Sequence, residues 1–410
     1  MVLVHRYVGL AMAAFLVLEG VTGAVLAFEG PIDRRLAPAT FASPPRPGAA
    51  PLSLSALAAG FEQRSPRARV GYFWVDGGRA TLAVLPRADP AGRPYQLGFD
   101  RVILDPWTGR ELLRQRYGDL SQGPVNFTPF LYELHQNLAV GPWGTILLGV
   151  VAVLWTLDCL VAIYLTLPVS WTRFLPRWKA AWVVKWPTSG FRLTFDLHRA
   201  KGLWLWAALL VFAWSSVMLT LPEVYGPING AFFDYRSDAA TFAEMSRRRP
   251  EPAPRLGWAQ AERLGAQYLG EAAARRGIDV ERPYGMAYIP DWGVYTYAVA
   301  SRANVQASSW GASLWLDGDT GRLVEVDLPV GEPTGNSIDT WLRALHFGDL
   351  RGSLAYRAIV CALGLAVVAL TITGVLIWLR KRAVRVARKR RVRPGTGPAR
   401  VVVAAARRPS

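Results

Sequence analysis

The segment His5-Arg-Tyr-Val-Gly-Leu10 returns in the second half of the chain as His198-Arg-Ala-Lys-Gly-Leu203, and each copy opens a long apolar run. Four such runs of 20 to 24 residues occur: Val8–Phe28, Gly144–Leu167, Gly202–Leu221 and Ala358–Leu379. A helix rises about 1.5 Å per residue, so each run is long enough to cross a hydrocarbon core of about 30 Å. The sequence therefore predicts four membrane-spanning helices.

The likeness between the two halves continues beyond the spans. Leu104-Asp-Pro-Trp-Thr-Gly-Arg110 corresponds to Leu316-Asp-Gly-Asp-Thr-Gly-Arg322, and both indicate two strands joined by a tight turn. Each turn is followed by a stretch ending in Leu-His, at His135 in the first half and His346 in the second. The interval from the turn glycine to the histidine is 26 residues in one half and 25 in the other. We interpret the chain as a tandem duplication, which predicts a four-helix bundle with pseudo-twofold symmetry.

The segments between the two spans of each half are too long to be loops. Residues 29–143 contain strand-like runs, and residues 222–357 contain a helical run, Trp258–Arg276, followed by strand-like runs. We expect a helix on a small antiparallel sheet in each, so the predicted fold class is an α+β membrane protein with two external domains. The predicted order is span 1–28, external domain 29–143, span 144–167, linker 168–201, span 202–221, external domain 222–357, span 358–379 and tail 380–410.

The net charge of +17 is concentrated in two short segments. The linker 168–201 carries seven basic residues and one acidic residue, and the tail from Arg380 carries twelve basic residues and no acidic one. The two external segments have net charges of opposite sign. The first carries 13 Arg and 10 acidic residues, and the second carries 14 Arg and 17 acidic residues. Short basic segments beside spans stay in the cytoplasm, so we expect both termini and the linker to be cytoplasmic and the large domains to be outside. We interpret the tail as an anchor at anionic lipid and expect no nucleic-acid partner.

The chain has four histidines, and each precedes a predicted span. His5 and His198 lie on the predicted cytoplasmic face and His135 and His346 on the outer face, so each face receives one histidine from each half. Neutral imidazole is a ligand for haem iron and other transition metals. Zinc would need three or four protein ligands, and no cysteine or carboxylate recurs beside each histidine. A haem supplies four ligands itself, so we expect two haems, each held by two axial imidazoles.

Charged residues near the histidines and inside the spans are further candidates. Arg6 and Arg199 directly follow the cytoplasmic histidines, and Arg343 lies one helical turn before the last histidine. Guanidinium groups suit haem propionates, although arginines at a membrane boundary also commonly extend to the interface. Glu19 and Asp158 are the only acidic residues inside the predicted spans. Burying each costs about 2.5–3.5 kcal/mol, so we expect a use for them, either proton transfer beside a quinol or haem, or polar contact with a neighbouring helix.

The motifs around the histidines resemble the PepSY-associated transmembrane family. They are His5-Arg-Tyr-Val-Gly9, Leu134-His-Gln-Asn-Leu-Ala-Val-Gly-Pro-Trp-Gly144, Asp196-Leu-His-Arg-Ala-Lys-Gly-Leu-Trp204 and Leu345-His-Phe-Gly-Asp349. The resemblance covers nearly the whole chain, in the order span, external PepSY-like domain, span, repeated. The family includes iron-regulated inner-membrane proteins and ferric-siderophore reductases. It therefore implies a bacterial inner-membrane location and haem b bound by the motif histidines, which are the four named above.

The resemblance also implies an activity, namely the passage of electrons across the membrane to a periplasmic ferric siderophore or other iron chelate. Reduction releases the metal because hard oxygen donors hold Fe(III) better than Fe(II). No dinucleotide-binding or Walker-type motif occurs in the sequence, so electrons must come from quinol, reduced flavin or a separate reductase. The alternative is a non-catalytic membrane protein whose PepSY-like domains bind a partner or have a regulatory role.

Overall fold

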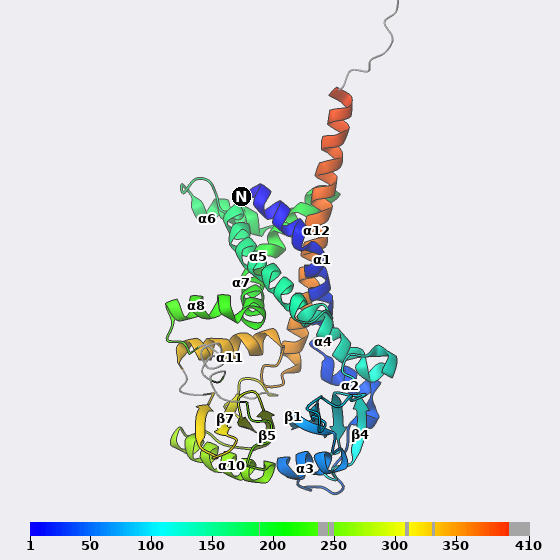
Figure 1. Ribbon diagram of the computed structural model, residues 1–410. Helices are drawn as coiled ribbons and strands as arrows, with labels where there is room; N and C mark the ends of the chain where they lie inside the picture. Colours follow the sequence, from blue (N-terminus) through cyan, green and yellow to red (C-terminus); the bar gives the residue numbers. More distant parts are fainter. Residues whose placement is uncertain (188, 237–244, 246–249, 308–310, 330–332, 393–410) are drawn as a thin grey trace, which may run out of the picture.

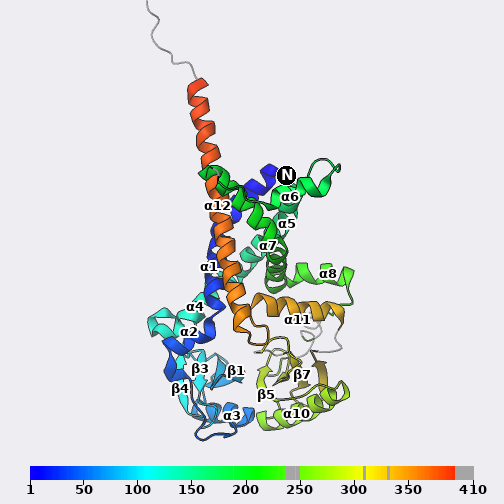
Figure 2. The same ribbon diagram turned by 180° about the vertical axis from the view of Figure 1, so that it is seen from behind.

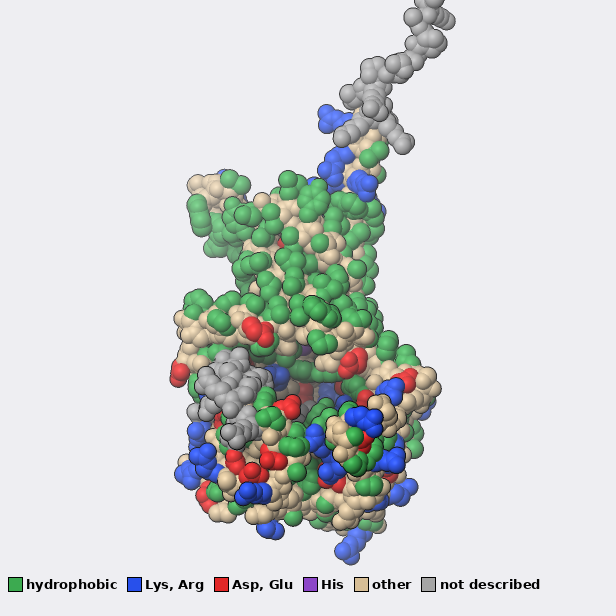
Figure 3. Space-filling model, viewed as in Figure 1, with side chains coloured by type: hydrophobic (Ala, Val, Ile, Leu, Met, Phe, Trp, Pro, Cys, Tyr) green, Lys and Arg blue, Asp and Glu red, His purple; other side chains and the backbone are tan. Residues whose placement is uncertain are grey.

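The computed structural model describes residues 1–187, 189–236, 245, 250–307, 311–329 and 333–392. Within them, four helices are long and apolar enough to cross a membrane: α1 (Val2–Leu26), α5 (Pro142–Thr166), α7 (Gly190–Thr220) and α12 (Leu354–Val392). They pack together as one bundle (Figure 1). Hydrophobic side chains cover the visible face of the bundle, whereas charged side chains gather over the domain below it and on the projecting end of α12 (Figure 3). The prediction of four membrane helices is confirmed.

Two of these helices extend beyond the apolar runs that predicted them. α7 begins at Gly190, where the Ser189 hydroxyl accepts a hydrogen bond from the backbone N–H of Arg192, so His198 lies inside the helix. α12 continues to Val392 and projects from the bundle (Figure 2). Hydropathy marks only the apolar part of a helix, whereas Lys, Arg and Ala are good helix formers that continue it into water. Residues 393–410 of the predicted tail lie outside the described residues.

Different parts of the chain lie at the two ends of the bundle. The N-terminus, α6 (Phe174–Trp182) and the projecting end of α12 lie at one end, and all the strands lie at the other (Figures 1 and 2). We call these the linker end and the sheet end. Both long segments between spans therefore lie on one side of the bundle, and the basic linker lies on the opposite side.

The two long segments together form a single antiparallel sheet with the strand order β4-β3-β2-β1-β5-β6-β7-β8. The strands are β1 (Ala68–Asp76), β2 (Arg79–Pro86), β3 (Arg101–Leu104), β4 (Glu111–Gln115), β5 (Arg282–Ile289), β6 (Val294–Ala300), β7 (Ala312–Asp317) and β8 (Leu323–Asp327). The segments join where β1 pairs with β5, and there Phe73 lies opposite Met286. Both side chains are fully buried, so the junction is part of one continuous core.

Two helices cover the face of the sheet that points away from the bundle: α3 (Leu54–Arg64) and α10 (Trp258–Arg275) (Figure 1). Phe73, Leu82 and Leu314 point into the core beneath them. Side chains alternate along a strand, so Tyr72 and Trp74 point to the opposite face, toward the bundle. The helix on an antiparallel sheet predicted for each segment is present, and the two sheets are continuous.

The repeated Asp-x-x-Thr-Gly motif forms the β3–β4 and β7–β8 turns, as predicted. Asp105 accepts a hydrogen bond from the Thr108 hydroxyl at 2.7 Å, and Gly109 adopts a φ of 70°. Asp317 and Gly321 repeat this arrangement, again with a φ of 70°. A side chain with a Cβ is strained at such a φ, which explains the glycine in both copies.

Short helices connect the bundle to the sheet: α2 (Glu29–Leu36), α4 (Phe127–Asn137), α8 (Pro222–Phe232) and α11 (Thr334–His346). α4 ends at Asn137 and is followed by Leu138, which has a left-handed φ of 56°, before Pro142 begins α5. α11 ends at His346, shortly before Gly348 with a φ of 67°. These endings place His135 and His346 in the last turns of two helices directly below the bundle.

Candidate functional site

The structure brings the four histidines together as two pairs, each with one member from each half of the chain. His5 on α1 faces His198 on α7 near the linker end, with ring centroids 6.2 Å apart and planes tilted by 53°. His135 on α4 faces His346 on α11 at the sheet end, at 6.3 Å and 55°. We call these the inner pair and the outer pair.

The spacing of both pairs suits one metal ion between two imidazoles. A five-membered ring with bonds of about 1.3 Å has each nitrogen about 1.1 Å from its centre. A metal–imidazole bond of about 2.0 Å on each side then places the two ring centres about 6.2 Å apart. The observed 6.2 and 6.3 Å agree with this requirement.

The Nδ1 atom of every one of these histidines is already hydrogen-bonded. The Nδ1 of His5 lies 3.0 Å from both carboxylate oxygens of Asp158, and that of His198 lies 3.1 Å from the carbonyl oxygen of Leu370. The Nδ1 of His135 lies 2.9 Å from a carboxylate oxygen of Glu19. Carboxylate and carbonyl oxygens only accept hydrogen bonds, so the Nδ1 atoms of His5 and His198 carry the proton. The Nδ1 of His135 carries it too, because its hydrogen-bond partner, the Thr22 hydroxyl, already donates to the Leu18 carbonyl oxygen.

The fourth histidine has the same tautomer for a related reason. The Nδ1 of His346 lies 2.8 Å from the Ser215 hydroxyl, and that hydroxyl already donates to the carbonyl oxygen of Phe212 at 3.0 Å. His346 therefore donates to Ser215, and its own Nε2 keeps a free lone pair. Burial lowers the pKa of His346 to about 3, helped by the nearby charges of His135 and Arg343, so the ring is neutral at physiological pH. Across the described residues no hydrogen bond reaches any histidine Nε2.

Glycines let neighbouring helices approach two of the rings. A Cβ built at Gly23 of α1 would lie 3.1 Å from the Cε1 atom of His135. A Cβ at Gly374 of α12 would lie 3.2 Å from the Cε1 atom of His198. Elsewhere on the same two helices, Gly20 and Gly364 pack backbone to backbone, and a Cβ at either would lie within 2.7 Å of the other's carbonyl oxygen. The bundle therefore holds the histidine-bearing helices at a separation that larger residues would not permit.

The three candidate arginines differ in whether they have hydrogen-bond partners. Arg199 donates to the backbone carbonyl oxygens of Ala180, Ala181 and Val183 and to Asp196, so it ties the end of α6 to α7. Arg343 lies in the last turn of α11 beside the outer pair. Arg6 follows His5 on α1, and both Arg6 and Arg343 are partly buried with no hydrogen bond or ion pair among the described residues. These two guanidinium groups are thus available to an anionic group beside a histidine pair.

Sequence reasoning missed the hydroxyl groups that hold the outer histidines. Thr22 accepts from the Nδ1 of His135 at 2.8 Å while donating to the Leu18 carbonyl oxygen, and Ser215 does the same for His346. Thr22 follows His5 by 17 residues, and Ser215 follows His198 by 17 residues. A comparison of the two halves at this offset would have revealed the pair.

A polar layer lies between the outer pair and the sheet. Burial raises the pKa of Glu29 to about 7, reinforced by the charge of Asp33 and opposed by Arg79 and Arg357. Asp33 also accepts a hydrogen bond from the buried Thr128 hydroxyl of α4 and pairs with Arg79 at 3.0 Å. These contacts link α2, α4, α12 and the sheet, so they fix the outer histidine helix relative to the domain below. Figure 3 shows a hollow with acidic and basic side chains between the bundle and the sheet.

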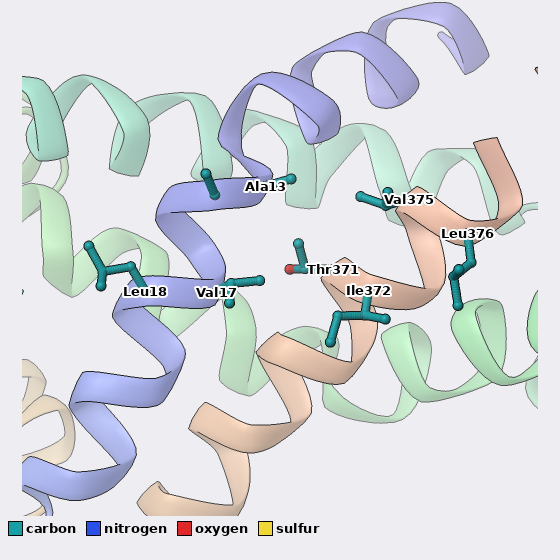
Figure 4. A pocket seen from close by; sticks show the side chains of 8 residues that line it. Ala13, Val17, Leu18, Thr371, Ile372, Val375 and Leu376 are labelled. Atoms are coloured by element: carbon teal, nitrogen blue, oxygen red, sulfur yellow. The ribbon is translucent and has the colours of Figure 1, made fainter. Parts of the chain in front are cut away.

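An open apolar groove of about 570 Å³ runs between α1 and α12. Ala13, Val17 and Leu18 line one side, and Thr371, Ile372 and Val375 line the other (Figure 4). The groove adjoins the inner pair, because Leu370, whose carbonyl oxygen accepts from His198, immediately precedes Thr371. Its walls are apolar except for Thr371.

Among the described residues, no cysteine or acidic side chain joins a histidine pair to form a larger set of metal ligands. In the part of the chain that the structure describes, no group of three or more His, Cys, Asp or Glu side chains converges as a metal site. Cys159 and Cys361 are both free thiols inside the bundle helices. Each pair thus presents two imidazole nitrogens, as a metal that brings its own equatorial ligands requires.

Comparison with known proteins gives one family. A model described as the PepSY-associated TM region matches residues 2–381, which include all four histidines and all four membrane helices apart from the far end of α12. No curated protein matches the chain.

Proposed function

Because the chain belongs to the PepSY-associated transmembrane family, we propose that it is a di-haem oxidoreductase that passes electrons across the membrane to a ferric chelate. The observation that carries the proposal is the arrangement of the histidines. Two facing pairs, one near each end of the bundle, have the spacing of axial ligands and keep all four Nε2 lone pairs free. Haem b, when bound at both pairs, supplies two low-spin one-electron carriers without an open coordination position.

The protein's own residues hold and orient the ligands. Each histidine is held by a hydrogen bond at Nδ1, which limits rotation of the ring and leaves its Nε2 for the metal. Arg6 at the inner pair and Arg343 at the outer pair would hold the haem propionates. Arg199 contributes at a distance, because its bonds to the end of α6 position the helix that carries His198.

The repeated order of elements supports a tandem duplication of a PepSY-like unit. Each half consists of a membrane helix, a helix that covers the sheet, four strands, a helix that ends near a histidine, and a second membrane helix. Each also has a hydroxyl 17 residues after its first histidine that receives the Nδ1–H of a histidine further on. We assign the halves of the sheet domain as two PepSY-like domains joined through β1 and β5.

We propose that the linker end is cytoplasmic and that the sheet end lies in the periplasm of a bacterial inner membrane. All five lysines lie in the linker and the tail, beside the spans. Such segments remain in the cytoplasm because moving their charge across the membrane is unfavourable. The donor, which is a quinol, reduced flavin or a separate reductase, then meets the inner pair. The iron chelate, of which a ferric siderophore is the class we favour, meets the outer pair.

Reporter fusions test this orientation. Fusions after Gly190 and Ala399 are expected to report the cytoplasm, and fusions near Pro90 and Gly265 are expected to report the periplasm. The measurement is a paired set of fusions to an enzyme active only in the cytoplasm and one active only outside it. A periplasmic signal from the tail fusion would reverse the proposed roles of the inner and outer pairs.

Haem content tests the function itself. Protein purified after expression with adequate haem supply is expected to carry two b-type haems per chain, with a low-spin bis-imidazole spectrum that shifts on reduction by dithionite. The measurement is the pyridine haemochrome assay against protein concentration. A protein without haem would contradict the oxidoreductase proposal and favour a membrane protein that binds or regulates a partner.

A further inference from the structure

The two histidines of each pair have chemically different partners. In the inner pair, His5 donates to the carboxylate of Asp158, whereas His198 donates to a backbone carbonyl and lies 3.1 Å from the Thr373 hydroxyl. In the outer pair, the Nδ1 of His135 lies 2.9 Å from the carboxylate of Glu19, whereas that of His346 has only the neutral Ser215 hydroxyl. Each pair therefore has one ligand beside a negative charge and one without.

Both carboxylates belong to the first half, which breaks the symmetry of the repeat. Glu19 follows His5 by 14 residues, and the residue 14 positions after His198 is Phe212. The Phe212 ring lies 5.4 Å from the His346 ring, in the place where a second carboxylate would stand. The hydroxyl at the 17-residue offset is retained in both halves, but the carboxylate is not.

Apart from their contacts with the histidines, the side chains of Glu19 and Asp158 have no hydrogen-bond partner among the described residues. The Oε1 atom of Glu19 is buried and has no hydrogen-bond partner among the described residues, and its Oε2 atom lies 2.9 Å from the Nδ1 of His135 as a close contact without a hydrogen bond. Asp158 is buried, and His5 is its only hydrogen-bond partner in the described chain. Acids in a membrane helix are costly, so their position at the ligands argues for a role there.

We propose that Glu19 and Asp158 are positioning residues that act through His135 and His5 to lower the reduction potentials of the two haems. The inference rests on the proposed haem binding. A carboxylate that accepts the Nδ1–H, as Asp158 does from His5, makes the Nε2 atom a stronger donor to the metal, whereas Glu19 places its negative charge 2.9 Å from the Nδ1 of His135. A stronger donor and a nearby negative charge both favour Fe(III) over Fe(II), because the more positive ion gains more from each.

The two carboxylates are expected to lower the reduction potentials of their haems by different amounts. Asp158 approaches the Nδ1 of His5 with both oxygens at 3.0 Å. At the outer pair the Nδ1–H of His135 is donated to the Thr22 hydroxyl at 2.8 Å, and the Glu19 carboxylate lies beside it at 2.9 Å without a hydrogen bond, so it acts through its charge alone. The inner haem should therefore have the lower potential, which is the order that outward electron flow needs.

Spectroelectrochemical titration of the purified, haem-loaded protein tests the proposal. Asp158→Asn should raise the midpoint of one haem, and Glu19→Gln should raise the midpoint of the other by a smaller amount. The Asp158→Asn amide oxygen can still accept the Nδ1–H of His5, and Thr22 still accepts that of His135 in Glu19→Gln, so both variants should keep two haems. Ser216→Ala, which removes a hydroxyl of α7 that donates to the Phe212 carbonyl oxygen and contacts no histidine, is the control and should leave both midpoints unchanged.

The conservative variants separate charge from packing. Asp158→Glu and Glu19→Asp keep a carboxylate. Both variants should therefore bind two haems with midpoints close to those of the unmodified protein, even where the corresponding amide variant loses its haem. Unchanged midpoints in both amide variants with two haems bound would overturn the inference and leave the proposed function standing. Loss of haem in the conservative variants as well would also overturn it, by assigning the acids a packing role. Absence of haem from the unmodified protein would instead contradict the proposed function.

Discussion

Replacement of His135 or His346 by alanine is expected to remove the outer haem and leave the inner one in place. The two rings face each other at 6.3 Å, so loss of either imidazole leaves the metal with one axial protein ligand. Replacement of His5 or His198 should do the reverse, because they form the inner pair at 6.2 Å. In each variant the haem content should fall from two to one per chain, measured by the pyridine haemochrome assay.

The same four variants distinguish the direction of electron flow. Reduction of a ferric siderophore should be abolished in all of them, but with a cytoplasmic-side donor the inner haem should still be reducible in the His135 and His346 variants. In the His5 and His198 variants the outer haem should stay oxidised. The pairing would be contradicted if His5→Ala and His135→Ala, which alter residues of the same half, removed the same haem.

Two glycine substitutions should weaken the binding of opposite haems without replacing any histidine. Gly23→Leu places a side chain where even a Cβ would be 3.1 Å from the His135 ring, and Gly374→Leu does so at 3.2 Å from the His198 ring. Each ring must move, and an axial ligand displaced by a few tenths of an ångström binds its metal poorly. We expect Gly23→Leu to weaken binding of the outer haem and Gly374→Leu that of the inner one, each by about tenfold or more in haem affinity, the lower range for defects in supporting residues, measured by haem titration of the apoprotein.

The chain offers a matched control on α7. Gly190 has nothing within 4 Å of a built Cβ and lies eight residues before His198, so Gly190→Leu adds the same side chain to a histidine-bearing helix away from the histidine pair and without meeting a neighbour. This control should keep two haems. Equal haem loss in the control and the test variants would show that any leucine disturbs the bundle and that the glycines beside the histidines have no special role.

Several features could be predicted from the sequence because they depend on local chemistry. The four spans follow from hydropathy and length, and the β3–β4 and β7–β8 turns follow from a motif in which Asp and Gly each have a fixed conformational role. The division of the histidines between the two faces follows from the alternation of spans. Pairing across the halves at each face was then an expectation from symmetry, and the structure places the rings in those pairs.

Other features depend on contacts between residues far apart in the chain. The joining of β1 to β5 requires two edge strands from different halves to meet, and neither strand carries a signal for its partner. The structural role of Arg199 also cannot be predicted from its position beside His198, because its guanidinium group donates hydrogen bonds to carbonyl oxygens of α6 and the linker. Likewise, Glu19 and Asp158 stand out in the sequence as acids inside spans, but the sequence does not show what they face.

The sequence by itself determined that this chain crosses a membrane four times, that its halves are alike, and that four histidines are the residues to examine. These conclusions rest on hydropathy, periodicity and the rarity of one residue type, which are properties of the chain in any conformation. Only the tertiary structure decided the separation of the imidazoles, the tautomer of each ring and the histidine that each acid serves. Those properties depend on helix packing, where a glycine or a hydroxyl at one contact sets distances that local sequence does not encode.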